Sequence, residues 1–161
     1  MERMKRRGTR ATEIQLENAR NELGEMFSRI KQMNRYPNYP NAVTFETVND
    51  EEFLWVVDYD EAVKQAKESM ENLFDDIGIT AWNQDFVESI VDSDIVDFVD
   101  PAFKAVMENN DYNLSKSRAW LPYLDELFEE SIRADGLGHT LSGYDGSEIE
   151  LDDGSYAFRT N

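Results

Sequence analysis

The stretch from Asn83 to Asp111 constrains the fold most, because it is strongly acidic and strongly apolar at once. It holds eight acidic residues against one basic residue, Lys104. The acidic residues are Asp85, Glu88, Asp92, Asp94, Asp97, Asp100, Glu108 and Asp111. Between them lie eleven phenylalanine, valine, isoleucine and methionine residues. Such a segment must turn its apolar side chains into a core and its carboxylates to solvent, as an amphipathic helix does.

Some of these carboxylates have the spacing of one helix face. Asp85, Glu88 and Asp92 are three and then four residues apart, so on a single helix they would form a stripe with about 4–6 Å between neighbours along the axis. A stripe of this kind either serves as a solvated, solubilising face or meets a basic partner. We therefore single out six candidate partner-binding residues: Asp85, Glu88, Asp92, Asp94, Asp97 and Asp100.

The formal net charge of −18 over 161 residues is unevenly distributed. Residues 1–35 hold nine basic and five acidic residues, a charge of +4, whereas residues 36–161 hold seven and 29, a charge of −22. The acidic part repels the phosphates of nucleic acids and membranes and attracts basic surfaces over a long range. We therefore expect the partner to be a basic, nucleic-acid-binding protein, with no direct contact to nucleic acid or membrane.

With 40% hydrophobic residues, the chain can bury a core despite its charge. We expect a single domain at residues 11–161, preceded by a basic arm at residues 1–10 that is flexible or folds onto the acidic body. The sequence has no cysteine, no apolar run long enough to cross a membrane, and no hydrophobic region behind its basic N-terminus. These features favour the cytoplasm as the compartment.

Residues 12–34 have apolar residues at spacings of three and four, which predict an amphipathic helix. The apolar stripe consists of Leu16, Ala19, Leu23, Met26, Phe27, Ile30 and Met33. The stripe either faces the core or forms a seam between two copies, since its spacing is similar to coiled-coil heptads over nearly three repeats. The sequence thus allows a homodimer through the 12–34 helix.

Two strands are predicted after the proline- and asparagine-rich loop at residues 36–41. Residues 42–48 are rich in β-branched side chains, and residues 53–57 form a second apolar run after a possible turn. A short helix over residues 50–57 is the alternative for the second segment.

Besides a helix in the acidic stretch, which follows a linker at residues 80–83, three further helices are predicted from periodicity and end signals. The first begins at Asp58 or Asp60 and ends at Gly78. Another restarts at Asp100 as N-cap, followed by proline, and the last begins near Pro122 and ends before Gly136. The side chains expected in the core are Leu73, Phe74, Phe86, Ile90, Phe103, Leu124 and Phe128.

The segment from Leu137 to Asn161 alternates short runs with glycine-containing turn signals, the pattern of a small β-meander. Its expected strands are residues 139–142, 148–151 and 155–159. Together these elements predict an α+β fold: a predominantly helical single domain with a small C-terminal antiparallel β-meander at 136–161.

The C-terminal segment also carries a motif. It consists of the run DGLGHTLSGYDGSE at residues 135–148, closed by YAFRTN at residues 156–161. This box resembles the C-terminal box of small acidic proteins of bacteriophages and mobile elements, which are of unassigned function. The stretch AWNQDF at residues 81–86 is similar to an element upstream in the same proteins. Phe158 departs from the pattern, in which tyrosine is common. The resemblance covers the last ~80 residues and implies a phage-like origin without a specific activity.

Catalytic and metal-binding interpretations are weak. His139 is the single histidine, and we expect it to bind a backbone carbonyl or Asp145 and stabilise a turn; Ser142 and Asp135 are only nominal partners for catalysis. The EF-hand spacing fails when started at Asp92. A few acidic residues of the tail could hold Ca²⁺ adventitiously: Asp145, Glu148, Glu150, Asp152 and Asp153. We predict no enzyme activity, no cofactor and no metal site.

The leading functional hypothesis is a phage-type acidic inhibitor that binds a host defence nuclease, of the CRISPR or restriction type, by mimicking nucleic-acid charge. The alternative is an acidic phage accessory or structural protein that interacts with other proteins and has no nuclease target.

Overall fold

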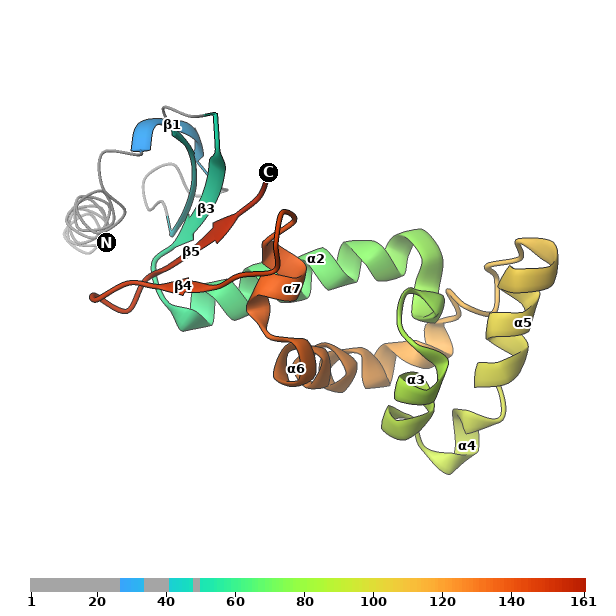
Figure 1. Ribbon diagram of the computed structural model, residues 1–161. Coiled ribbons are helices and arrows are strands. Elements are labelled where there is room, and N and C mark those ends of the chain that lie inside the picture. Colours follow the sequence, from blue (N-terminus) through green and yellow to red (C-terminus); the bar gives the residue numbers. More distant parts are fainter. Residues whose placement is uncertain (1–26, 34–40, 48–49) are drawn as a thin grey trace, which may run out of the picture. The chain divides into compact units, whose positions relative to one another are not determined.

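The computed structural model describes residues 27–33, 41–47 and 50–161, and the chain divides into two compact units (Figure 1). The first unit combines Met1–Ala66 with Asp135–Asn161, and the second is Lys67–Ala134. All the described strands lie in the first unit, whereas the described elements of the second are helical. The predicted α+β class is therefore confirmed. The basic arm at 1–10 lies outside the described residues, and the single domain at 11–161 stays a prediction.

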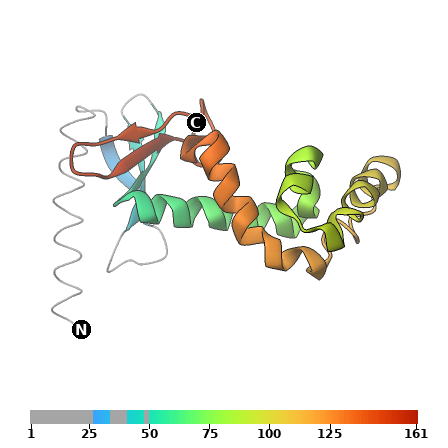
Figure 2. The same cartoon turned by 90° about the horizontal axis from the view of Figure 1, so that it is seen from below.

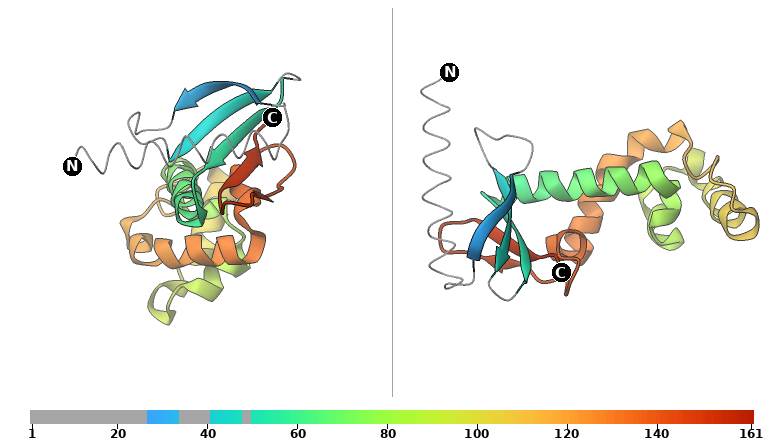
Figure 3. Two further views of the ribbon diagram at one scale, coloured as in Figure 1. Left: turned by 90° about the vertical axis from the view of Figure 1, so that its left-hand side faces the viewer. Right: turned by 90° about the horizontal axis from the view of Figure 1, so that it is seen from above.

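The first unit is built on a five-stranded antiparallel sheet with the order β1-β2-β3-β5-β4 (Figure 3). The strands are β1 Phe27–Met33, β2 Ala42–Thr47, β3 Glu52–Val56, β4 Ile149–Glu150 and β5 Tyr156–Arg159. The two strands predicted at 42–48 and 53–57 are confirmed over their described residues, and the alternative helix at 50–57 is wrong. The chain's last strand pairs with β3, so the sheet joins distant parts of the sequence.

The core of the sheet forms on the alternating positions of its central strands. A buried cluster consists of Val43, Phe53, Trp55, Leu151 and Ala157. Trp55 is opposite Val43 in one neighbouring strand and opposite Ala157 in the other. Because side chains alternate between the two faces of a strand, this register places one residue each of β2, β3 and β5 side by side in the buried cluster.

The helix predicted at 12–34 is wrong over Phe27–Met33, which form β1. The register of β1 shifts between Phe27 and Arg29 and again between Ile30 and Gln32. Phe27, Ile30 and Met33, three apart, are therefore opposite every second residue of β2, namely Thr47, Phe45 and Val43. Because of these two bulge-like irregularities, apolar residues that are three apart in the sequence, a spacing typical of a helix, occur in a strand. The described part of the proposed dimer seam is sheet, and its remainder lies outside the described residues.

The C-terminal meander is present only in part. Residues 136–161 contribute the antiparallel pair β4 and β5, but the first expected strand, 139–142, is wrong. The short helix α7, Leu137–Leu141, occupies that place. Gly136 precedes it with a φ of +80°, and the Glu148 carboxylate accepts the N–H groups of Leu137 at 2.5 Å and Gly138 at 3.2 Å. This acceptor, supplied from later in the chain, stabilises a helix that the local sequence does not signal.

The long helix α2, Tyr59–Ile77, confirms the predicted helix at this place. The Asp58 carboxylate accepts the N–H of Glu61 at 2.8 Å, as an N-cap residue does. Gly78 ends the helix with a φ of +71° and opens the 3₁₀ helix η1, Gly78–Ala81. Later in the unit, Pro122 lies inside the 3₁₀ helix η2, Arg118–Tyr123, and not in the first turn of α6, Leu124–Asp135.

The acidic stretch forms three short helices, where one helix and a restart at Asp100 were expected (Figure 2). They are α3 Gln84–Ile90, α4 Ser93–Val96 and α5 Val99–Asn109. Val91 and Asp92 have extended backbones, which end α3 before Asp92. The predicted single stripe of Asp85, Glu88 and Asp92 is therefore wrong. Asp100 lies in the first turn of α5, and the N-cap position that we assigned to it belongs to Phe98.

The predicted core is correct in part. Phe74, Leu124 and Phe128 are buried, whereas Leu73 is 42% exposed and its prediction is wrong. Successive side chains on a helix point about 100° apart, so Phe74 takes the inward direction and Leu73 does not. Three others are only half-buried: Phe86, Ile90 and Phe103. Among the described residues, no helix combines the length and apolar character needed to cross a membrane.

Candidate partner-binding surface

The six candidate carboxylates all belong to the α3–α5 segment of the second unit. Asp85 and Glu88 lie on α3, and the others follow at the start of α4, within it, after it and in α5: Asp92, Asp94, Asp97 and Asp100. Five of the six are exposed, and Glu88 is half-buried. α3 packs against α5, and α4 against α5, so the three helices hold these residues in one region.

Gln84 brings Glu88 and Asp100 together. Its Nε2 amide group donates to Glu88 Oε1 at 3.2 Å and to Asp100 Oδ1 at 3.0 Å. Lys104 pairs with Asp100 Oδ2 at 2.9 Å, four residues along the same helix. The hydrogen bonds from Lys104 and Gln84 lower the pKa of Asp100 below its ordinary value. One amide therefore ties α3 to α5 through two of the predicted residues.

Asp92 and Asp94 lie near Tyr123 at the end of η2. The Tyr123 hydroxyl donates to Asp92 Oδ2 at 3.2 Å. Burial raises the pKa of Tyr123, and the hydrogen bond to Asp92 and the charges of Asp92 and Asp94 raise it further. The start of α4 is thereby connected to η2 through a neutral tyrosine and not through a basic residue.

The carboxylates of Asp85, Asp94 and Asp97 have no hydrogen-bond or ion-pair partner among the described residues. Like charges that remain exposed and unpaired repel one another and attract cations. The predicted set therefore divides into two carboxylates held by Gln84, one held by Tyr123, and three that are free to meet a partner.

Two large apolar residues of this surface were missed by the sequence reasoning. Phe98, which directly follows Asp97, is 52% exposed, and Met107 on α5 is 80% exposed. Both had been assigned to the apolar side of the stretch. The position between Asp97 and Asp100 gives no signal, because Val99, which shares it, is fully buried.

The charge of this surface suits ion pairs with basic side chains. Residues 67–134 hold 16 acidic and five basic residues, a formal charge of −11. Within the described part of the chain, no group of three or more histidine, cysteine, aspartate or glutamate residues is placed to hold a metal ion. Exposed carboxylates of this density form salt-sensitive ion pairs with lysine and arginine, each contributing about 0–1 kcal/mol.

The C-terminal box has structural roles in the first unit. Gly138 lies directly against the backbone carbonyl of Gly146, where a side chain would not fit. Ser142 Oγ donates to the Arg159 carbonyl oxygen at 2.7 Å, and the Arg159 guanidinium lies 3.7 Å from the centre of the Tyr144 ring. These contacts connect α7 and the following turn to β5.

His139 does not have the role that we expected. It is exposed on α7, and the Asp145 carboxylate accepts from Ser142 Oγ and from the Ser147 N–H, both at 3.0 Å. The interpretation that His139 binds Asp145 is therefore wrong. Ser142 is buried and bonded to Asp145 and Arg159, so the nominal catalytic grouping is not assembled.

Comparisons with protein-family models, with curated proteins and with solved structures found no match.

Proposed function

We propose that this chain is an acidic binding protein that docks through α3, α4 and α5 onto a basic, nucleic-acid-binding surface of another protein. The observation that carries the proposal is the exposure of five carboxylates on this segment: Asp85, Asp92, Asp94, Asp97 and Asp100. Among the described residues, only Asp100 of these five has an ion-pair partner. A basic partner relieves the electrostatic repulsion between these carboxylates, and this favours binding.

The class of partner follows from charge and from the C-terminal box. DNA carries one phosphate per ~3.4 Å of each strand, and the exposed carboxylates of α3–α5 likewise gather several negative charges in one region. Together with the phage-like box, this makes a host defence nuclease, of the CRISPR or restriction type, the target we propose. Binding takes place in the cytoplasm of the host cell, and the chain acts as an inhibitor and not as an enzyme.

The second candidate is an acidic phage accessory or structural protein without a nuclease target. It is favoured by Phe98 and Met107, because a pure charge mimic has no need of large exposed apolar side chains. A mixed apolar and acidic surface is equally suited to a lasting contact with another structural protein.

A nuclease protection assay tests the first candidate. The test variant combines Asp85→Asn, Glu88→Gln, Asp92→Asn and Asp97→Asn. The amides retain an oxygen that can accept from Gln84 and Tyr123, so the variant should fold. We expect it to lose inhibition, and we expect inhibition by the wild type to weaken as salt rises toward about 0.15 M and the Debye length shrinks to ~8 Å.

A matched control removes four charges from outside α3–α5. Its changes are Asp60→Asn, Asp76→Asn, Glu126→Gln and Asp135→Asn, all at exposed positions. Inhibition should survive in this control. If the test variant inhibits as well as the wild type, charge mimicry by α3–α5 is excluded.

A further inference from the structure

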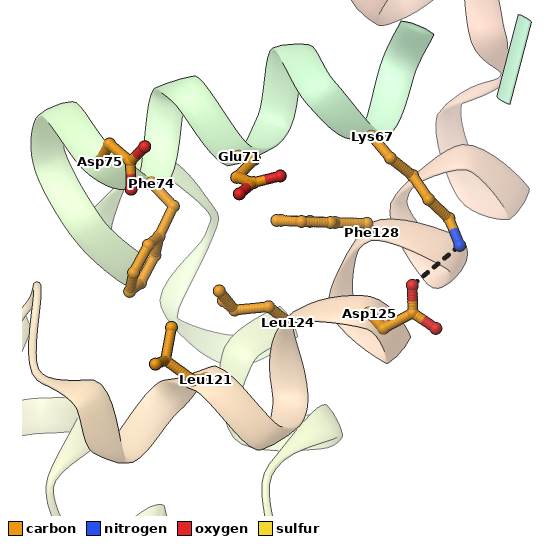
Figure 4. Close-up of a pocket in the computed structure, with 8 residues that line it drawn as sticks. All are labelled: Lys67, Glu71, Phe74, Asp75, Leu121, Leu124, Asp125 and Phe128. Carbon is orange, nitrogen blue, oxygen red and sulfur yellow. Dashed lines mark hydrogen bonds and ion pairs between the residues drawn. The ribbon is translucent and has the colours of Figure 1, made fainter. Parts of the chain in front are cut away.

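A groove in the second unit lies between α2 on one side and η2 with α6 on the other (Figure 4). Its volume is about 360 Å³, near the lower end of the roughly 300–1,000 Å³ of ligand pockets and enough for one or two side chains of a peptide. Its lining residues are Lys67, Glu71, Phe74, Asp75, Leu121, Leu124, Asp125 and Phe128. None of them belongs to the α3–α5 surface.

The floor of the groove is apolar and held in place. Phe74, Leu124 and Phe128 are buried, and the Trp82 ring stacks on Phe128 with 5.6 Å between the ring centroids. Leu121, by contrast, is 48% exposed. A bound apolar side chain would cover Leu121 and gain about 25 cal/mol for each Å² of apolar surface removed from water.

The rim of the groove is acidic, and one end of it is partly neutralised by a lysine. Lys67 Nζ pairs with Asp125 at 2.8 Å and with Glu129 at 3.0 Å, which satisfies the α6 side. Glu71 and Asp75 lie one turn apart on α2 and are exposed. Neither has an ion-pair partner within the described part of the chain. In Figure 4 the Glu71 carboxylate points from α2 into the groove.

We infer that this groove is a second docking site, which takes a basic amphipathic segment of a partner protein. One apolar side chain of the segment enters beside Leu121, between Phe74 and Phe128. A lysine or arginine next to it pairs with Glu71 and Asp75. Charge selects this occupant, because residues 67–134 carry a formal charge of −11 and repel acidic segments.

The site is separate from the α3–α5 surface and does not depend on the function proposed for that surface. The apolar floor supplies a contact that high salt does not screen, whereas α3–α5 offers mainly carboxylates. The two sites together would give a partner one contact that is sensitive to salt and one that persists.

A fluorescent peptide of about four helical turns tests the inference, with leucines on one face and arginines beside them. Two control peptides replace the leucines by serine or the arginines by glutamine. We expect the full chain to bind the first peptide at about 0.15 M salt and each control at least about tenfold more weakly. If the serine peptide binds as tightly as the first, the apolar floor is not used and the inference fails.

Variants of the chain locate the binding. Glu71→Gln with Asp75→Asn, and separately Leu121→Lys, should each weaken peptide binding about tenfold or more. Leu121→Ala is a milder variant in case Leu121→Lys does not fold, as judged by circular dichroism. The matched control is Asp60→Asn with Asp135→Asn, which removes the same charge from exposed positions outside the groove and outside α3–α5. This control should bind within about twofold of the wild type.

Chemical-shift changes of the backbone amides in a ¹⁵N correlation spectrum show where on the chain the peptide binds. Residues 71–75 and 121–128 should shift on titration with the peptide, and residues 84–109 should not. If the two double variants weaken binding equally, or if the shifts fall on 84–109, the peptide is held by net charge and the groove is not a site. Either result would leave the nuclease assay for α3–α5 unaffected.

Discussion

Gly78 and Ser115 are in backbone contact at the end of α2. The N–H of Ile79 donates to the Ser115 carbonyl oxygen at 3.0 Å. The Ser115 side chain is fully buried, and its Oγ donates to the Ile77 carbonyl oxygen at 2.6 Å. Helices α3 to α5 lie between these two residues in the sequence, so the contact closes the segment that carries the candidate carboxylates.

Gly78→Ala should be strongly destabilising. A Cβ at this position would overlap the Ser115 carbonyl group, and the φ of +71° is in the left-handed region, where a residue with a Cβ costs roughly 1–2 kcal/mol. We expect a loss of free energy of unfolding that exceeds this backbone cost, as measured by urea denaturation.

Gly154→Ala is the control for the steric part. Gly154 has a φ of +84°, and a Cβ there would meet no atom within 4 Å. It should therefore show the backbone cost alone. Equal losses of free energy of unfolding for the two variants would mean that overlap of the new Cβ with Ser115 adds nothing to the effect of Gly78→Ala.

Glu148→Ala should destabilise α7. The Leu137 and Gly138 N–H groups would lose their acceptor, and loss of such a cap costs about 0.5–2 kcal/mol. Glu148→Gln retains a carbonyl oxygen and should lose less. Denaturation curves that are the same for alanine, glutamine and the wild type would show that the cap is not stabilising.

Asp145 should make the stability of the protein sensitive to acid. The Ser147 N–H, and then the hydrogen bonds from the side chains of Ser142 and Ser147, lower the pKa of the Asp145 carboxyl below 3.8. A carboxyl with a lowered folded-state pKa contributes stability in full above its unfolded-state pKa and loses it as pH falls through the folded-state pKa. The stability advantage over Asp145→Asn should thus be largest near neutral pH.

Urea denaturation of both proteins from neutral pH to well below 3.8 measures this advantage. It should shrink as pH falls below the ordinary aspartate value. A difference that stays constant over the whole range would mean that the ionised carboxylate is not the stabilising form.

The fold was predictable where the sequence pattern is local. The periodicity of residues 59–77, the β-branched residues at 42–47 and the apolar run within 52–56 each match the element that forms. β1 was misassigned because its two register irregularities give a strand the apolar spacing of a helix. α7 was misassigned because its stabilising acceptor, Glu148, comes from eleven residues away. Both errors come from tertiary contacts that no short window of sequence contains.

The sequence predicts which acidic residues the candidate site contains, but not which of them lie together in space. The carboxylates are exposed, as their solvation requires, and the charge of the stretch is visible in the sequence. That Gln84 would join Glu88 to Asp100 depends on α3 packing against α5. The break at Val91, which moves Asp92 away from α3, has no glycine or proline to signal it. The groove brings α2 together with the adjoining η2 and α6, two segments that are far apart in the chain.

Lys104→Gln should strengthen binding to a basic partner. Lys104 is the single basic residue of the α3–α5 segment, and it pairs with Asp100 at 2.9 Å. Its removal frees that carboxylate, while Gln84 still holds Asp100 near Glu88. Because one exposed charge contributes modestly, we expect a gain in affinity of about two- to fivefold at low salt. Titration of the partner at low and physiological salt measures it, and the gain should shrink as screening increases.

Lys116→Gln separates a local effect from one of net charge. Lys116 also carries one positive charge in the second unit, but its ammonium group lies 5.8 Å from the centre of the Tyr112 ring, outside α3–α5. Its removal should change the affinity less than the removal of Lys104 does, because the freed negative potential lies away from the candidate carboxylates. If both variants bind the partner equally tightly, the attraction comes from the overall charge of the chain, and Asp100 has no special place in the interface.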